Sequence, residues 1–178
     1  MTRRNQILLV FGATLSSLGS ALFTSLALDR RLPNSLVSLL LYLPPGLLFG
    51  GLVVVPWTRF MAQPRSYSAG ALAVTVVAYP GALQALDFHL GGNADMWLAG
   101  LVGAAIVSFS ARPIRPIHVP QLAATGFFAT LLSTTLAAWI PRGFPAQLAT
   151  FLTWQVAVAI WFSRRPKRES DPDRRGYA

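Results

Sequence analysis

Long stretches without any charged residue constrain this chain most. Six of them follow one another along the sequence: Asn5–Leu28, Leu32–Thr58, Ser66–Leu86, Met96–Ala111, Val119–Pro141 and Gly143–Ser163. A helix needs roughly 20 apolar residues to cross a hydrocarbon core about 30 Å thick, and all but the fourth stretch are that long. The sequence therefore predicts an all-α, polytopic integral membrane protein with six transmembrane helices, over residues 6–28, 35–57, 68–88, 93–111, 120–140 and 144–163.

The composition of the chain supports this prediction. The 178 residues are 53% hydrophobic and 12% charged, whereas soluble domains carry roughly 25% charged residues. A soluble fold could bury one core, but it could not hide apolar residues on every face of every segment. The chain contains no cysteine, which excludes disulfides, thiol catalysis and thiolate metal sites.

The basic residues predict the orientation of the helices. Six helices put both termini on one side, which then carries twelve Lys and Arg residues in the N-terminus, the second and fourth connections and the tail. The other side has Arg30, Arg31 and Arg142. Because basic residues collect on the cytoplasmic side, we expect both termini to face the cytoplasm, in the cytoplasmic (inner) membrane of a bacterium. The net charge of +9 then reflects topology, and no nucleic-acid partner is expected.

The two ends of the chain need separate interpretation. The first apolar stretch exceeds the 7–15 residues of a signal-peptide core and runs into Asp29 and Arg30. We interpret it as a retained helix, with cleavage after Ala27 as the alternative. Residues 164–178 are polar, of mixed charge and contain two prolines, so we expect a basic, disordered cytoplasmic tail. Tryptophans near the predicted helix ends, Trp57, Trp97, Trp139 and Trp161, are typical of anchors at the membrane interface.

Small residues recur every four positions in the first helix. One row consists of Gly12, Ser16, Ser20 and Thr24, and the neighbouring row includes Ala13, Ser17 and Ala21. Four-residue spacing places each row along one side of a helix, and close backbone approach across small residues holds helices together in lipid. The pattern predicts either a contact between helices of this chain or an interface with another membrane protein chain or a second copy.

Prolines near the middle of two helices suggest a further site. Pro44 and Pro45 lie in the second helix, and Tyr79 and Pro80 lie at a similar depth in the third. Proline removes a backbone donor from its helix, so we predict a kink in each of these helices. Interrupted helices line substrate sites in some transporters. The kinks therefore either serve packing alone or border a cavity. The candidate ligand-binding residues are Pro44, Pro45, Tyr79, Pro80, Gln84, Trp154 and Gln155.

Catalytic chemistry has little support in the sequence. The one acid–base cluster, Asp87, His89 and Asp95, falls in a predicted outer loop, where solvated loop residues are the alternative to a metal or proton site. No predicted span contains a lysine or a central pair of carboxylates, and no phosphate loop, serine-nucleophile motif or paired metal-binding histidines occur. We therefore predict no enzymatic activity, no catalytic residue, no metal and no cofactor.

In size, helix number, cytoplasmic termini and a first helix rich in small residues, the chain resembles the substrate-binding subunits of energy-coupling-factor vitamin importers. The resemblance is architectural, and no binding motif of that group is matched. It implies a small membrane subunit that binds a small solute or a lipid between kinked helices and acts with a partner chain in transport. The alternative hypothesis is a non-catalytic accessory subunit that stabilises or tethers a larger membrane complex, and a third is a self-associating pore.

Overall fold

The computed structural model describes residues 1–27, 34–84, 93–110 and 119–164. The helices are α1 (Arg3–Ala27), α2 (Asn34–Phe49), the π-helical segment η1 (Gly50–Val54), α3 (Val55–Phe60), α4 (Arg65–Gln84), α5 (Ala94–Phe109), α6 (Val119–Ala137) and α7 (Phe144–Ser163). No strand occurs among these residues, so the all-α prediction is confirmed. The expected tail beyond residue 164, and the loop residues Asp87 and His89, lie outside the described residues.

The segments α2, η1 and α3 form one continuous rod. The backbone keeps α-helical angles at both junctions, with φ −65° and ψ −45° at Phe49 and φ −62° and ψ −48° at Val55. Pro44 and Pro45 lie inside α2 without ending it, and the irregular turn of the helix comes after them, at Gly50–Val54. Counted this way, the described residues form six helical rods, which matches the number of helices that the sequence predicts.

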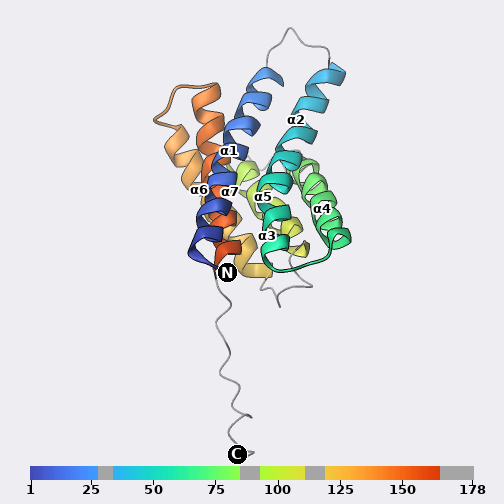
Figure 1. The fold of residues 1–178 in the computed structure, drawn as a ribbon. Coiled ribbons are helices and arrows are strands. Elements are labelled where there is room, and N and C mark those ends of the chain that lie inside the picture. The colour runs from blue at the N-terminus through green and yellow to red at the C-terminus, as the bar shows by residue number, and fades with distance from the viewer. Residues whose placement is uncertain (28–33, 85–92, 111–118, 165–178) are drawn as a thin grey trace, which may run out of the picture.

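The six rods form a closed ring in chain order (Figure 1). Helix α1 packs on α2, α2 on α4, α4 on α5, α5 on α6, α6 on α7, and α7 returns to α1. The first and last helices meet at the end where α1 begins, because Gln6 Nε2 donates a hydrogen bond of 3.0 Å to the carbonyl oxygen of Ser163. We call this end of the ring, which holds the start of α1 and the α3–α4 turn, the N-terminal end.

Close approach between neighbouring rods depends on small residues. A Cβ atom added at Gly126 of α6 would lie 2.2 Å from the carbonyl oxygen of Gly100 on α5. One added at Gly46 of α2 would lie 2.8 Å from Cα of Val76 on α4. Such contacts bring backbones close enough for dispersion forces to hold the rods together without large side chains between them.

The small residues of α1 lie inside the ring. A Cβ atom at Gly12 would meet the Leu52 carbonyl of η1 at 2.3 Å, and Ser17 and Ser20 hydrogen-bond to Gln155 of α7. The predicted rows are therefore covered by helices of this same chain. All seven predicted residues are buried: Gly12, Ala13, Ser16, Ser17, Ser20, Ala21 and Thr24.

The half of the ring nearest the N-terminal end is a packed core. Trp57 of α3 is 1% exposed and Phe162 of α7 is 2% exposed, with their ring centroids 4.7 Å apart. Trp57 is thus part of the core and is not the interfacial anchor that the sequence suggests. The same core contains, with exposures of 0%, Leu9, Val53, Val54, Val107, Leu122 and Val158.

Two of the described helices, α1 and α7, are long and apolar enough, each taken alone, to cross a membrane. Helix α5 is apolar but shorter. The coarser part of the prediction, a helical protein with segments suited to a membrane, is thus supported by the described residues.

Candidate functional site

A cavity of about 340 Å³ lies within the ring. Every one of the six rods contributes to its wall, so it is a central feature and not a crevice between two neighbours. The lining residues are Thr24, Leu41, Ala78, Tyr79, Ala82, Met96, Ala99, Gly100, Gly103, Thr130, Gln147, Thr150, Phe151 and Trp154.

The cavity occupies the half of the ring away from the N-terminal end. Most of its lining comes from the last turns of α1 and α4, the first part of α5 and the first part of α7. In the other half, large side chains such as Trp57, Leu122 and Phe162 fill the space between the rods. The ring is therefore hollow in one half and solid in the other.

Trp154 forms the boundary between the hollow half and the packed half. Its indole nitrogen donates a hydrogen bond of 3.1 Å to the carbonyl oxygen of Gly100, which ties α7 to α5 across the ring. Its ring centroid lies 5.6 Å from that of Phe49 on α2 and 6.1 Å from that of Tyr79 on α4. Only 8% of Trp154 is exposed. An indole fixed at both its polar and its apolar parts makes a rigid wall.

Gln155, the next residue of α7, organises a buried polar network behind that wall. Its amide nitrogen donates to Ser20 Oγ at 3.2 Å and to Tyr79 Oη at 2.9 Å. Its amide oxygen lies 3.2 Å from Ser17 Oγ, whose one hydrogen is shared with the carbonyl oxygen of Ala13 at 2.7 Å. Because Gln155 is 0% exposed, these bonds replace the water that the amide has lost, and they connect α7 with both α1 and α4.

The described lining of the cavity is neutral. Thr130 and Thr150 donate to carbonyl oxygens of their own helices, at 2.9 Å and 3.0 Å. Tyr79, Gln147 and Thr24 are the other lining residues with a polar side-chain group. No lining residue among those described carries a charge, and the described residues contain no cluster of side chains able to hold a metal ion.

The residues singled out from the sequence fall into three groups. Tyr79 and Trp154 line the cavity. Gln155 is not a lining residue, but its side-chain amide is hydrogen-bonded to the hydroxyl of Tyr79. Three prolines, Pro44, Pro45 and Pro80, lie inside their helices and outside the cavity wall. The Gln84 side chain lies outside the described part of the chain, and Asp95 belongs to the first turn of α5, not to the cavity wall.

Sequence reasoning missed the contribution of the first half of α7. Gln147, Thr150 and Phe151 join Trp154 on one face of this helix, at spacings of three or four residues. The polar residues Gln147 and Thr150 within a charge-free stretch were a usable signal. Ala99 and Gly103 of α5 carry no such signal, because a small residue can serve helix contact or open space equally well.

Comparison of the chain with protein-family models, with curated proteins and with solved structures gives no match. The chemistry that the cavity offers is given by the residues that line it.

Proposed function

We propose that this chain crosses a membrane six times and binds one small, uncharged solute or lipid group inside its ring of helices. The observation that carries the proposal is the neutral cavity of about 340 Å³ to which all six rods contribute. A pocket of this volume is at the lower end of the range found for small-molecule sites, and pockets of that kind are mostly apolar with a few placed polar groups.

The distribution of side chains over the surface supports the membrane part of the proposal. Along α1 the buried positions other than Leu9 are small or polar, whereas Ile7 is 61% exposed, Phe11 59% and Leu22 50%. Helix α6 also exposes large apolar side chains, since Phe128 is 63% exposed and Leu132 is 54% exposed. Large apolar side chains outside and hydroxyls inside are unfavourable in water and favourable in lipid.

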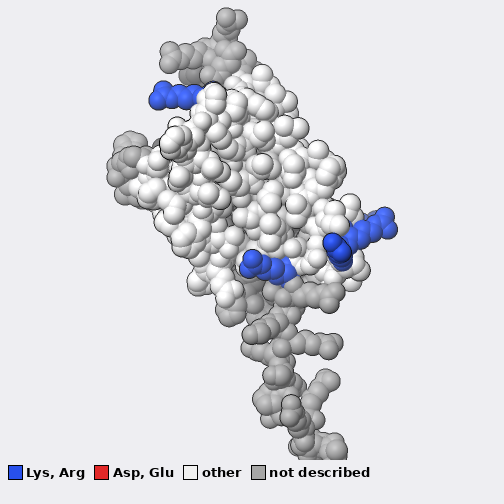
Figure 2. Space-filling model, turned by 90° about the vertical axis from the view of Figure 1, so that its left-hand side faces the viewer, with Lys and Arg blue, Asp and Glu red and all other residues white. Residues whose placement is uncertain are grey.

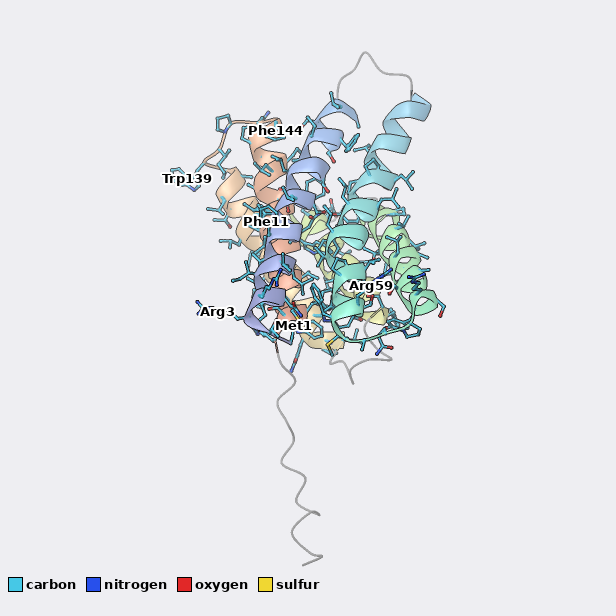
Figure 3. All side chains as sticks on the ribbon, viewed as in Figure 1. Met1, Arg3, Phe11, Arg59, Trp139 and Phe144 are labelled. Carbon is cyan, nitrogen blue, oxygen red and sulfur yellow. The ribbon has the colours of Figure 1, made fainter. Side chains whose placement is uncertain are left out.

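Charged side chains are confined to the ends of the described helices. Arg3 and Arg4 lie in the first turn of α1, and Arg59 lies in the last turn of α3. Figure 3 places Arg3 and Arg59 at one end of the molecule and Trp139 and Phe144 at the other. Figure 2 shows a broad face between the two ends on which no described side chain is charged. This arrangement leaves an uncharged band around the protein, as a bilayer requires.

Helices α4 and α6 carry several hydroxyl side chains within their apolar stretches. Some of these hydroxyls lie on the inward face, where Thr75 and Ser133 are 0% exposed. Exposed hydroxyls are also satisfied within their own helix, since Thr135 of α6 donates to the Leu131 carbonyl at 2.9 Å. A lipid-facing helix tolerates such hydroxyls because they hydrogen-bond to its own backbone.

The packed half of the ring limits the directions in which a bound solute could leave the cavity. A solute in the cavity meets Trp154 and, beyond it, the core around Trp57 and Phe162, so a static ring gives it no path toward the N-terminal end. Transport would need the rods to move apart. We propose that a partner chain drives that motion and that this chain supplies the binding site.

The test compares two alanine-to-phenylalanine variants. Ala99 lines the cavity, so Ala99→Phe fills it, whereas Ala124 is exposed on the outer face of α6 and Ala124→Phe adds the same group there. Wild type and both variants are extracted with their native lipids, and bound small molecules and chains are identified by native mass spectrometry. The expected result is one defined small molecule on wild type and Ala124→Phe that is lost from Ala99→Phe.

Two results would overturn the proposal. A small molecule retained by Ala99→Phe, with an unchanged melting temperature, would show that it binds outside the cavity. A wild-type protein that carries no small molecule but a stoichiometric protein chain would identify an accessory subunit instead.

A further inference from the structure

We infer that the ligand is an uncharged amphiphile, bound with its hydrocarbon end against Trp154 and its polar end toward the far end of the ring. The far end is the one where α1 ends and α7 begins, opposite the N-terminal end. The inference rests on the proposed function, because it concerns the same cavity. It adds the class of ligand and the direction in which the ligand lies.

The polar groups in the part of the cavity next to Trp154 are already hydrogen-bonded within the protein. Thr130 and Thr150 donate to carbonyl oxygens of their own helices. The indole nitrogen of Trp154 donates to a backbone carbonyl of α5. The Tyr79 hydroxyl is hydrogen-bonded to the Gln155 amide, and this bond exists whichever way the amide is turned. Because each of these groups has a partner, this part of the wall accommodates hydrocarbon without a loss of hydrogen bonds.

Carbon atoms close the cavity beside Trp154. A Cβ atom added at Gly103 of α5 would lie 3.4 Å from Cζ2 of Trp154 and 3.2 Å from Cβ of Ala82. The ring of Phe151 stacks on that of Tyr79, with centroids 6.0 Å apart. A polar ligand group placed here would lose its water and gain no partner, which is unfavourable. The end of the ligand that reaches Trp154 is therefore apolar.

The hydrogen-bonding capacity that the described part of the wall leaves unused lies toward the far end. Thr24 and Gln147 line the cavity, and the side chains of neither are hydrogen-bonded within the described part of the chain. Thr24 belongs to the last turn of α1 and Gln147 to the first turn of α7. Trp154 lies about two helical turns, or roughly 10 Å, beyond Gln147 along α7. The polarity of the wall thus changes along the cavity, as an amphiphile requires.

The polar end of the ligand carries no charge. None of the lining residues that the structure describes is charged. An ion moved from water into a site of low dielectric is destabilised unless a partner of opposite charge is present. A hydroxyl, ester or amide group meets this condition, whereas a carboxylate or an ammonium group does not.

Two photoreactive alcohols test the direction of binding. The diazirine of 3-azioctanol is near the hydroxyl, and that of 7-azioctanol is near the other end of the same chain. Wild-type protein in lipid nanodiscs is irradiated with each probe, and labelled residues are identified by mass spectrometry of peptides. We expect 3-azioctanol to label the turns that contain Thr24 and Gln147. We expect 7-azioctanol to label the wall beside Trp154, at Phe151 and Gly103. The reverse pattern, or the same positions labelled by both probes, would overturn the inference.

Alcohol in the surrounding lipid also labels the outside of the protein, and two variants separate this labelling from that of the cavity. Ala99→Phe fills the cavity, so it should abolish labelling of the lining positions and preserve labelling at exposed positions such as Phe128 and Leu132. Ala124→Phe, on the outer face of α6, is the matched control and should preserve both.

Competition by unlabelled alcohols tests the apolar end of the site on the wild-type protein alone. The chains of 1-octanol and 1,8-octanediol are of equal length, but the diol carries a second hydroxyl at the end that would reach Trp154. Each is added at a matched concentration in the membrane, and labelling of Phe151 and Gly103 by 7-azioctanol is measured. We expect the diol to compete at least about tenfold less effectively, because its second hydroxyl would be buried without a partner. Octanoate, which replaces the hydroxyl with a charge, should also compete less than 1-octanol.

The remaining outcomes distinguish this inference from the proposed function. If Ala99→Phe abolishes labelling of the lining but the diol or octanoate competes as well as 1-octanol, the cavity is the site and the ligand is not the amphiphile inferred. If the lining positions remain labelled in Ala99→Phe, with an unchanged melting temperature, the proposed function fails and the inference fails with it.

Discussion

The indole nitrogen of Trp57 donates a hydrogen bond of 3.1 Å to the carbonyl oxygen of Phe162, and the rings of the two residues lie 4.7 Å apart. The contact joins α3 to the last turn of α7, next to the bond between Gln6 and Ser163. Residues more than one hundred positions apart thereby close one half of the ring. The hollow half, with Tyr79 and Trp154 in its wall, is left on the other side of this contact.

Removal of the Trp57 side chain should destabilise the protein strongly. Trp57→Ala leaves a void in a site that is 1% exposed, and we expect a loss of about 3–5 kcal/mol. The control is Trp139→Ala at the other end of the molecule, where the side chain is 87% exposed and a change within about 0.5 kcal/mol is expected. Thermal unfolding in nanodiscs, followed by circular dichroism, measures both. Equal shifts for the two variants would contradict the packed core.

The topology can be mapped by cysteine labelling, because the wild-type chain has no cysteine. Gln63 lies in the turn between α3 and α4, and Arg142 lies in the turn between α6 and α7. With six spans, a membrane-impermeant maleimide should label Gln63→Cys and Arg142→Cys from opposite sides, and Thr2→Cys from the same side as Gln63→Cys. If α1 and α7 alone crossed the membrane, Gln63→Cys and Arg142→Cys would react from one side together.

The contact between α5 and α6 should be sensitive to a single methyl group. A Cβ atom at Gly126 would lie 2.2 Å from the Gly100 carbonyl oxygen, so Gly126→Ala forces the two helices apart, at a cost of about 1–3 kcal/mol. Gly70 lies in α4 with no atom within 4 Å of an added Cβ, and Gly70→Ala should stabilise its helix by about 0.5–1 kcal/mol. Melting temperatures should therefore move in opposite directions. A fall in both would count against the close approach of α5 and α6.

The buried amide of Gln155 should contribute to stability as well as to the cavity wall. Gln155→Leu removes one hydrogen-bond partner from each of Tyr79, Ser17 and Ser20, and an unfavourable change of about 1–3 kcal/mol is expected. Gln121→Leu, at an exposed position of α6, is the control and should change the melting temperature little. An unchanged melting temperature for Gln155→Leu would mean that the network does not hold α7 to α1 and α4.

Much of the helical organisation could be predicted from the linear sequence. The charge-free stretches predict the helices of the structure to within a few residues, as for α7, which begins at Phe144 and ends at Ser163 as expected. The rows of small residues in α1 predict a close helix contact, and Gly12 makes one with Leu52. Such patterns are readable because they depend on residues that are neighbours along one helix.

The position of the site was harder to predict, and the prolines show why. Pro44 and Pro45 suggest a discontinuity, yet α2 continues through them and the π-helical turn comes later, at Gly50–Val54. Neither proline lines the cavity. A proline marks a missing donor in its own helix, but it does not show which neighbouring side chains leave space beside it.

The sequence by itself determined that the chain is helical, where its helices run and which of their faces are small. The tertiary structure alone decided that the rods close into a ring, that Trp57 and Phe162 fill one half of it and that Tyr79, Phe151 and Trp154 border a hollow in the other. The physical reason is that helix formation depends on neighbours a few positions away. A cavity depends on whether side chains from separate helices meet, and a glycine such as Gly103 has the same local signature in a contact and beside an open space.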